Sequence, residues 1–371
     1  MVGPDAPKVD RNVLGVIKKV GTDIGATVMG LLKQNHEATA ILGGRYIHSV
    51  NALVGGVSKS ITEEERERLV EIAKNSIEVA KFSLKIFDDV VLANQDYVDL
   101  ILSDAYTQET YYMGLVDENN HTNFYDGKVR VVDPEGKEFV KYAPDEYLDV
   151  VAEHVEPWSY LKFPYLKEVG WKGLEEGKES GVYQATPLSR LNAADGMATP
   201  LAQAEYERFY DTLGGEPVHH TLATHWARLI ELLYAAERSL ELSEDPEITS
   251  DDIRTVPTET PTEGVGIVEA PRGTLTHNYA TDENGMLMKV NLIVGTTNNY
   301  AAIDMSIKKA AKGLIEPGVE ISEPILNQIE MAFRAYDPCF GCATHAIPGR
   351  QAFQVRVFNH EEELVQEVMR E

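Results

Sequence analysis

Hydrophobic residues at helical spacing mark most of the chain. A capping-box pattern, Thr62 followed three residues later by Glu65, predicts the start of a long helix that extends to about residue 105. This predicted helix carries an apolar stripe, which we interpret as core packing: Leu69, Ile72, Ala73, Ile77, Ala80, Leu84 and Phe87. Further helical patterns cover residues 10–42, 199–213 and 224–242, and the glycine-rich residues 42–61 are expected to form an ordered loop.

Two stretches change to a strand pattern. The alternating run 128–132 lies between an Asp-Gly and a Glu-Gly turn dipeptide, so residues 110–142 are expected to contain a small hairpin. Residues 265–298 are interpreted as two strands joined at Asn284-Gly285. The expected fold class is therefore mainly α (α+β), a large helical bundle with small β-hairpin excursions.

A last helix is predicted near the C-terminus. Ser322 can cap it, with Pro324 in its first turn. The helix is expected to end at Asp337, because a residue that precedes proline, here Pro338, is disfavoured in the helical region.

The charge balance excludes some classes of partner. The 371 residues include 60 acidic and 34 basic side chains, a formal net charge of −26, which repels phosphate backbones and anionic lipid headgroups. Nucleic-acid and membrane partners are therefore not expected. The first residues show no secretory signal pattern, and no apolar run approaches the roughly 18 residues of a membrane span. We expect a cytoplasmic protein.

Candidate chemistry concentrates at the only two cysteines, Cys339 and Cys342. Two intervening residues let both sulfurs converge on one metal ion, and soft thiolates favour zinc, copper, nickel or iron. A closed zinc site needs four ligands, so the spacing alone leaves metal ligation, a redox dithiol and two buried structural cysteines open. The histidines at 219, 220 and 225 are interpreted as ordinary packed or surface residues, because their spacing places no two on one helix face.

Three segments carry a resemblance to a known family. Residues 337–345 read "DPCFGCATH", residues 269–277 read "EAPRGTLTH" followed at 294–299 by "VGTTNN", and residues 43–57 read "GGRYIHSVNALVGGV". In order and spacing they resemble the large, catalytic subunit of nickel–iron hydrogenases. The acidic character is similar to that of the cytosolic enzymes of methanogens that do not reduce the deazaflavin coenzyme.

The resemblance implies a nickel–iron centre, in which the iron carries cyanide and carbon monoxide. Cys339 would be a terminal thiolate on nickel and Cys342 a bridging one. Arg272 would hold its guanidinium over the metals, and Asp337 would orient it. Residues expected to line the pocket of the diatomic ligands are Pro271, Leu275 and Thr296. His345 would lie near a structural magnesium or iron ion.

Purely structural interpretations of three of these features stay open. Arg272 and Asp337 could form an ordinary buried ion pair, and Thr296 could be a hydroxyl at a strand end. His48 resembles a family histidine near the contact with the small subunit, or it could simply pack in the core.

The chain also departs from the family pattern. The other two nickel thiolates of the family lie in an R-x-C-G-x-C motif, which this sequence lacks. The expectation is that Met1 falls inside the family's usual chain, or that a separate polypeptide supplies the missing half. Ser49, Val54 and Gly295 stand where the family has prolines.

The expected organisation is a hydrogenase large-subunit domain over residues 1–345 and a C-terminal extension, 346–371, that a maturation endopeptidase removes. The resemblance implies reversible heterolytic oxidation of molecular hydrogen, with electrons leaving through an iron–sulfur small subunit and further electron-transfer subunits. The alternative is a catalytically inactive fragment or scaffold that binds a small subunit.

Overall fold

The computed structural model describes residues 7–10, 12–315, 318, 320–339 and 353–370. The chain divides into two units, Met1–Tyr336 and Asp337–Glu371. Helices of the first unit are α1 (Val13–Val20), α2 (Thr22–Gly43), α3 (Glu63–Phe87), α4 (Gln95–Ile101), α5 (Tyr147–Val150), α6 (Pro187–Ala193), α7 (Pro200–Leu213), α8 (Thr224–Glu244), α9 (Gly295–Asn298), α10 (Tyr300–Leu314) and α11 (Glu323–Arg334). Its strands are β1 (Ala52–Leu53), β2 (Gly56–Val57), β3 (Tyr111–Val116), β4 (His121–Thr122), β5 (Lys128–Val132), β6 (Glu138–Tyr142), β7 (Val151–Val155), β8 (Lys162–Leu166), β9 (Tyr183–Gln184), β10 (Gly196–Met197), β11 (Glu263–Ala270), β12 (Gly273–Thr281) and β13 (Leu287–Ile293).

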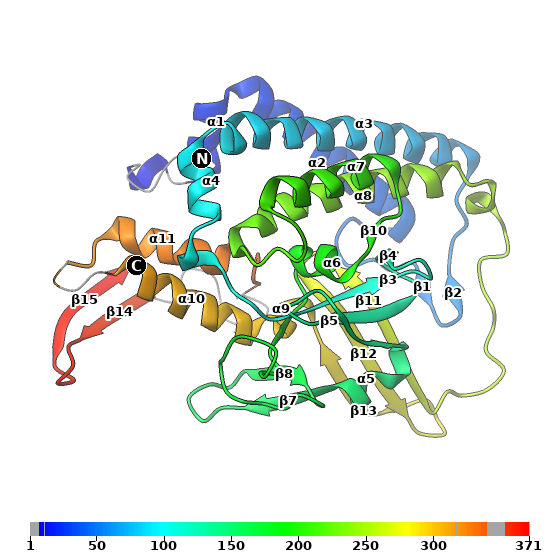
Figure 1. Ribbon diagram of the computed structural model, residues 1–371. Coiled ribbons are helices and arrows are strands. Elements are labelled where there is room, and N and C mark those ends of the chain that lie inside the picture. The colour runs from blue at the N-terminus through cyan, green and yellow to red at the C-terminus, as the bar shows by residue number, and fades with distance from the viewer. Residues whose placement is uncertain (1–6, 11, 316–317, 319, 340–352, 371) are drawn as a thin grey trace. The chain divides into compact units, whose positions relative to one another are not determined.

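The largest hydrophobic core forms where α3 packs along α8 (Figure 1). The predicted capping box starts α3: the Thr62 hydroxyl accepts the Glu65 N–H at 3.2 Å, and the Glu65 carboxylate accepts the Thr62 N–H at 3.1 Å. Six members of the predicted stripe are buried, and the seventh, Phe87, packs against the core from a partly buried position. The prediction of core packing is therefore confirmed.

The helix predicted to reach residue 105 is shorter than expected. α3 ends at Phe87, a π-helical turn covers Asp88–Leu92, and α4 begins at Gln95. Asn94 takes an extended conformation, and its side chain accepts the Asp96 N–H at 3.0 Å. An asparagine that bonds a neighbouring backbone amide in this way caps a new helix and interrupts the old one.

The predicted strand 128–132 is confirmed as β5, and it belongs to a sheet of six strands. The order is β10-β4-β3-β5-β6, with β9 parallel to β3. All six residues of β3 are buried, because helix α6 covers this strand. The central strand of the sheet is thus enclosed, while β5 and β6 form the antiparallel hairpin that the turn dipeptides predict.

The segment interpreted as two strands forms three, in the order β11-β12-β13. The turn at Asn284-Gly285 joins β12 to β13, as predicted. The further turn joins β11 to β12 through Pro271 and Arg272, with Ala270 paired to Gly273. Two-residue hairpin turns usually contain asparagine or glycine, and this turn carries neither, so no local signal marks it in the sequence.

The last helix of the first unit, α11, begins after Ser322 with Pro324 in its first turn, as predicted. It ends at Arg334 and not at Asp337 as expected. The Ala335 carbonyl accepts a hydrogen bond from Arg228 at 2.8 Å, and the Tyr336 N–H bonds back to Phe333 at 3.1 Å in a tighter turn. These contacts end the helix at Arg334, ahead of Asp337, the residue whose helical conformation Pro338 disfavours.

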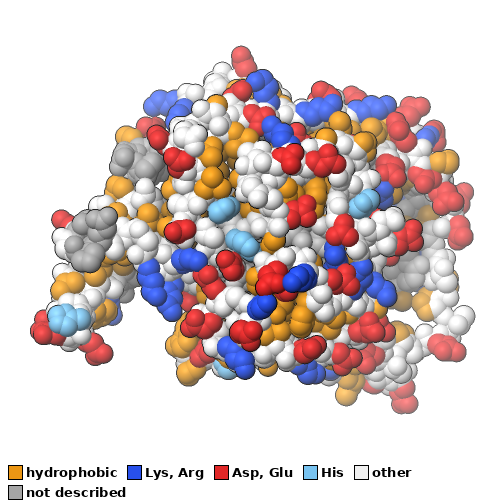
Figure 2. Space-filling model, viewed as in Figure 1, with side chains coloured by type: hydrophobic (Ala, Val, Ile, Leu, Met, Phe, Trp, Pro, Cys, Tyr) orange, Lys and Arg blue, Asp and Glu red, His pale blue; other side chains and the backbone are white. Residues whose placement is uncertain are grey.

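The second unit contains an antiparallel hairpin of β14 (Phe353–Phe358) and β15 (Leu364–Arg370). The expected boundary between residues 345 and 346 lies outside the described residues, so the removable extension stays a prediction. Carboxylates are spread over the face in view (Figure 2), as expected from the net charge of −26. Over the residues that the structure covers, no helix is long and apolar enough to cross a bilayer.

The packing of α8 predicts unequal effects of two substitutions on its opposite faces. Ile230 is completely buried and Leu232 is 44% exposed. Ile230→Ala should lower the free energy of unfolding of the full chain by about 2–5 kcal/mol, and Leu232→Ala by less than about 1 kcal/mol. Urea unfolding followed by tryptophan fluorescence measures both values. Equal losses would contradict this assignment of the helix faces.

Candidate functional site

The turn between β11 and β12 carries Arg272, and three side-chain contacts fix its backbone. The Arg190 guanidinium donates to the carbonyl of Ala270 at 2.9 Å and to that of Pro271 at 3.2 Å. The Asn299 amide donates to the carbonyl of Arg272 at 3.0 Å. Three consecutive carbonyls of the turn therefore accept hydrogen bonds from side chains of distant segments.

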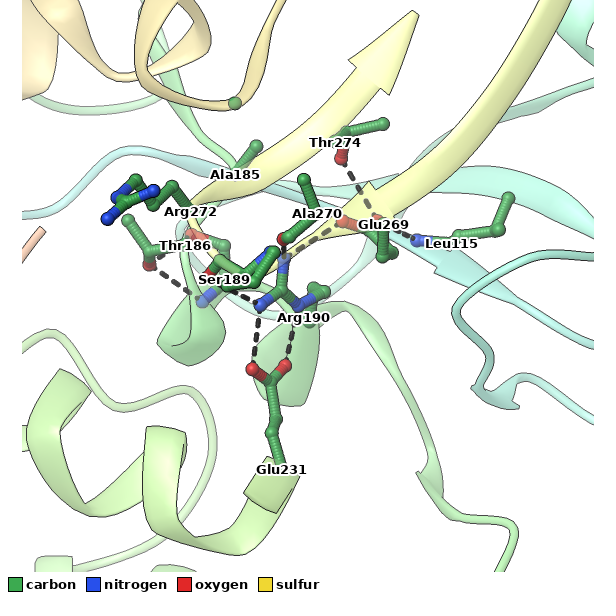
Figure 3. Close-up of polar contacts among 12 residues, drawn as sticks. Leu115, Ala185, Thr186, Ser189, Arg190, Glu231, Glu269, Ala270, Arg272 and Thr274 are labelled. Atoms are coloured by element: carbon green, nitrogen blue, oxygen red, sulfur yellow. Dashed lines mark hydrogen bonds and ion pairs between the residues drawn. The ribbon is translucent and has the colours of Figure 1, made fainter. Parts of the chain in front are cut away.

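Arg190 itself is held in a buried cluster with two carboxylates (Figure 3). Its Nε and Nη2 donate to the two oxygens of Glu231 at 2.5 and 2.6 Å, and Nη1 donates to Glu269 at 2.9 Å. The side chains of the three residues are only 1–7% exposed. Together with the two carbonyls, these contacts use all five N–H donors of the guanidinium.

Local structure explains how Arg190 reaches this position. It lies on the short, fully buried helix α6, which starts after Thr186. The Thr186 hydroxyl accepts the Ser189 N–H at 3.1 Å, and Pro187 occupies the first turn, where its missing N–H costs nothing. The cap fixes the helix directly under the turn that Arg190 binds.

Glu269 is fixed from a second side. One of its carboxylate oxygens accepts the Leu115 N–H of β3 at 2.8 Å and the Thr274 hydroxyl at 3.0 Å. Burial raises the pKa of Glu269, and the charge of Arg190 opposes that rise. In every described contact the Glu269 carboxylate accepts a hydrogen bond, which is the pattern that an ionised acid satisfies best.

Two glycines let the Arg272 turn approach the start of α9. Gly273 has a φ of 149°, and a Cβ there would lie 2.6 Å from the Gly295 carbonyl oxygen and 2.7 Å from that of Ala185. A Cβ on Gly295 would meet the Arg272 carbonyl carbon at 3.1 Å. The backbone of Arg272 therefore lies against the residue that precedes the buried Thr296.

Adjacent asparagines, Asn298 and Asn299, tie α9 to the same place. Asn298 donates to the Thr274 carbonyl at 2.6 Å and accepts the Tyr183 hydroxyl at 2.6 Å. Asn299 also accepts the Ala185 N–H at 2.8 Å. Both asparagines are buried, so these amides replace water as the partners of backbone groups at the site.

The structure brings together four of the residues that the sequence predicts for the site. Pro271 is exposed, Arg272 and Leu275 are partly buried, and Thr296 is buried in the first turn of α9, a helix that follows β13. They occupy the β11–β12 turn, the start of β12 and the adjoining end of α9. The supporting residues Arg190, Glu231 and Asn299 were not predicted from the sequence.

The remaining predicted residues belong to the second unit or lie outside the described part of the chain. Asp337 is exposed, with a φ of 51°, and Cys339 is partly buried. Cys342 and His345 lie outside the described residues, so the pairing of Arg272 with Asp337 and the ligand roles stay predictions. Within the described ranges, no group of three or more His, Cys, Asp or Glu side chains could hold a metal ion.

Two of the histidines that the sequence predicts to be ordinary packed or surface residues, His219 and His220, have ordinary partners. His219 bonds the Tyr112 hydroxyl at 2.6 Å, and His220 bonds the Thr107 hydroxyl at 2.9 Å. Burial lowers the pKa of both imidazoles. His48 is exposed, so its interpretation as a core residue is wrong.

Comparisons with known proteins identify the family of the chain. A family described as "Nickel-dependent hydrogenase" matches residues 27–345, most of the chain. The chain belongs to this nickel-dependent hydrogenase family, and it is an oxidoreductase of the large-subunit type.

Individual relatives support the predicted group within the family. The chain is 46% identical over 368 residues to an iron-sulfur subunit of the F420-non-reducing hydrogenase of Archaeoglobus profundus, covering 99% of this chain and 76% of that one. It is 36% identical over 375 residues to the NAD-reducing hydrogenase HoxS subunit beta of Cupriavidus necator, covering 99% and 74%. The first of these names confirms the predicted similarity to hydrogenases that do not reduce the deazaflavin coenzyme.

A solved structure confirms the fold class. The chain matches the crystal structure of an NAD+-reducing [NiFe]-hydrogenase in the H2-reduced state, with a TM-score of 0.81 and 32% identity. The match covers 93% of this chain and 74% of that chain. The mainly helical α+β architecture is therefore that of a hydrogenase large subunit.

Close packing at Gly273 predicts a larger loss of stability there than at a glycine in open space. Gly273→Ala adds a Cβ that overlaps two carbonyl oxygens, whereas Gly214, at φ 95°, has no atom within 4 Å of an added Cβ. Gly214→Ala should cost about 1–2 kcal/mol through its left-handed backbone. Gly273→Ala should cost about 1–3 kcal/mol more through the overlap. Urea midpoints of the two full-length variants compare them, and equal midpoints would show that the turn has room to move.

Proposed function

We propose that this chain carries out the hydrogenase reaction of its family, the reversible heterolytic oxidation of H2 to two protons and two electrons. The observation that supports it most is the fixed β11–β12 turn, which holds Arg272 against the segment containing Thr296. Both residues stand in segments that resemble motifs of the family, and the family match extends to residue 345. A rigid cation beside a reaction centre stabilises developing charge without the cost of reorganisation.

The proposed cofactor is a nickel–iron centre whose iron carries cyanide and carbon monoxide. Such a centre supplies hydrogen binding and accepts the electrons. The chain contains ligands of the right type for this centre, because cysteine thiolates are soft ligands that suit nickel and iron. It contains only two cysteines, however, and the centre that the resemblance implies needs four thiolates. We infer that polypeptide outside this sequence provides the other two.

The proposed roles of the chain's own residues follow from their chemistry. Cys339 would hold nickel, and its sulfur would accept the proton released when H2 splits, because a thiolate ligand keeps a lone pair that can bind a proton. Arg272 would polarise hydrogen or stabilise charge through its planar guanidinium, a fixed cation. Asp337 orients that guanidinium. Pro271, Leu275 and Thr296 would line the pocket of the diatomic ligands, where the Thr296 hydroxyl could donate a hydrogen bond to a cyanide.

The proposed partners complete the path of the electrons. The electrons leave through an iron–sulfur small subunit and further electron-transfer subunits. This chain has no cysteines left for iron–sulfur clusters, because both of its cysteines are assigned to the metal centre. Cys342 would hold the centre as its second thiolate from this chain, and His345 would lie near a magnesium or iron ion. A maturation endopeptidase then removes residues 346–371. We propose that the assembled enzyme lies in the cytoplasm and serves methanogenesis, as the resemblance to the cytosolic enzymes of methanogens implies.

The second candidate function is an inactive scaffold that binds a small subunit without catalysis. The count of two cysteines favours it. Nickel and iron analysis of the complex purified with its partner subunits, together with hydrogen-dependent reduction of a viologen dye, separates the two. About one nickel per chain with dye reduction supports the enzyme, and a metal-free, inactive complex supports the scaffold.

Loss of one thiolate tests the metal assignment. Cys339→Ser replaces a soft thiolate by a hydroxyl that binds nickel poorly. Nickel in the purified complex should fall at least tenfold, and dye reduction should be lost. Ser83→Ala, on a helix remote in sequence from the cysteine motif, is the control and should keep both. Full nickel retention in Cys339→Ser would remove this residue from the ligand set.

Arg272→Lys tests the catalytic cation. Lysine keeps the charge but loses the planar guanidinium and its fixed geometry. Turnover in dye reduction should fall about 100-fold, with nickel content unchanged. Arg254→Lys, an exposed residue, serves as the matched control with unchanged turnover. Unchanged turnover in Arg272→Lys would show that the guanidinium has no catalytic role.

A further inference from the structure

The β11–β12 turn lacks the residues that would make it tight on its own. Two-residue hairpin turns favour a positive φ at the first central position, whereas the ring of Pro271 holds its φ at about −65°. Neither Pro271 nor Arg272 is among the described residues with positive φ. Turns of this kind splay the strands, so the position of Arg272 has to come from contacts outside the turn.

Those contacts come chiefly from one side chain. Arg190 binds the carbonyls of Ala270 and Pro271, the two residues immediately before Arg272. It also bonds Glu269, which lies one residue earlier on the same strand. A planar guanidinium can bridge these three neighbouring groups at once, and an ammonium cannot.

Glu231 keeps the guanidinium aimed at the turn. Its two oxygens take Nε and Nη2 in a bidentate pair at 2.5 and 2.6 Å, on the side opposite the strand. In Figure 3 Glu231 reaches Arg190 from helix α8, and the Arg272 side chain extends away from Arg190. The two arginines are therefore coupled through the backbone and do not share these carboxylates.

We propose that Arg190, held by Glu231, is the positioning residue of the active site: it sets the place of the Arg272 guanidinium by fixing the backbone of its turn. The expected effect on turnover rests on the proposed hydrogenase function. The coupling between Arg190 and the backbone of the turn does not depend on that function. A displacement of about 1 Å in a positioned catalytic group can lower a rate by two orders of magnitude. Disturbing Arg190 should thus affect the reaction without removing any metal ligand.

Two variants and one control test the coupling in the full chain. Arg190→Lys keeps the positive charge and loses the planar guanidinium with its five N–H donors. Glu231→Gln keeps the shape of the Glu231 side chain and loses its negative charge. Arg130→Lys is the control, because Arg130 is also a largely buried arginine, and its described partners, Glu138, Asp195 and the Ala193 carbonyl, all lie outside the turn. Hydrogen exchange followed by mass spectrometry reports the amides of residues 268–276.

Exchange in residues 268–276 should accelerate at least tenfold in Arg190→Lys and Glu231→Gln, and remain within twofold of the parent in Arg130→Lys. If Arg190→Lys does not fold, the milder Glu231→Gln decides. Unchanged exchange at the turn would overturn the proposal. So would equal acceleration in the Arg130→Lys control, since that would indicate general loss of stability.

The assembled complex supplies the second readout. In Glu231→Gln, kcat per nickel for dye reduction should fall at least tenfold, with the KM for hydrogen and the nickel content unchanged. A purely structural role would lower the nickel content or the amount of folded complex and leave kcat per nickel unchanged, which would overturn the positioning role. A parent complex without nickel or activity would refute the proposed function instead, and the exchange measurement would still judge the coupling.

Discussion

The guanidinium of Arg190 is buried and donates all five of its N–H groups, to two carboxylates and two backbone carbonyls. Removing one partner of such a cluster leaves a charge in the core without compensation, which costs far more than the cluster contributes to stability. The cluster therefore constrains every element that meets there. Helix α6, helix α8, strand β3 and the β11–β12 turn are all fixed relative to this one group.

Features with a local signal could be predicted from the sequence. Thr62 and Glu65 lie three residues apart and satisfy each other, so the start of α3 follows from their spacing alone. Arg190 lies 41 positions before Glu231 and 79 before Glu269, and nothing in one sequence pairs them. The sequence indicates only that α8 carries a carboxylate next to Ile230 on its buried face, which calls for a buried cationic partner without identifying it. The β11–β12 turn was missed because Pro271 and Arg272 carry no turn signal.

Arg272 and Thr296 could be predicted only because their motifs resemble those of a family, and the structure then shows that the backbone of Arg272 lies against Gly295, the residue before Thr296. Gly295, a departure from the family pattern, fits this contact, because any Cβ there would crowd the Arg272 carbonyl carbon. The cysteine motif belongs to the second unit. The proposed metal centre needs four thiolates, and this chain contains two cysteines.

The most direct test of the proposed centre is an experimental structure of the assembled complex with anomalous scattering measured at the nickel edge. We predict one nickel peak bonded to the sulfurs of Cys339 and Cys342, with the Arg272 guanidinium facing it and Arg190 still bound to the carbonyls of Ala270 and Pro271. A nickel peak bonded to other residues would contradict the assignment, and so would an Arg272 side chain directed away from the metal.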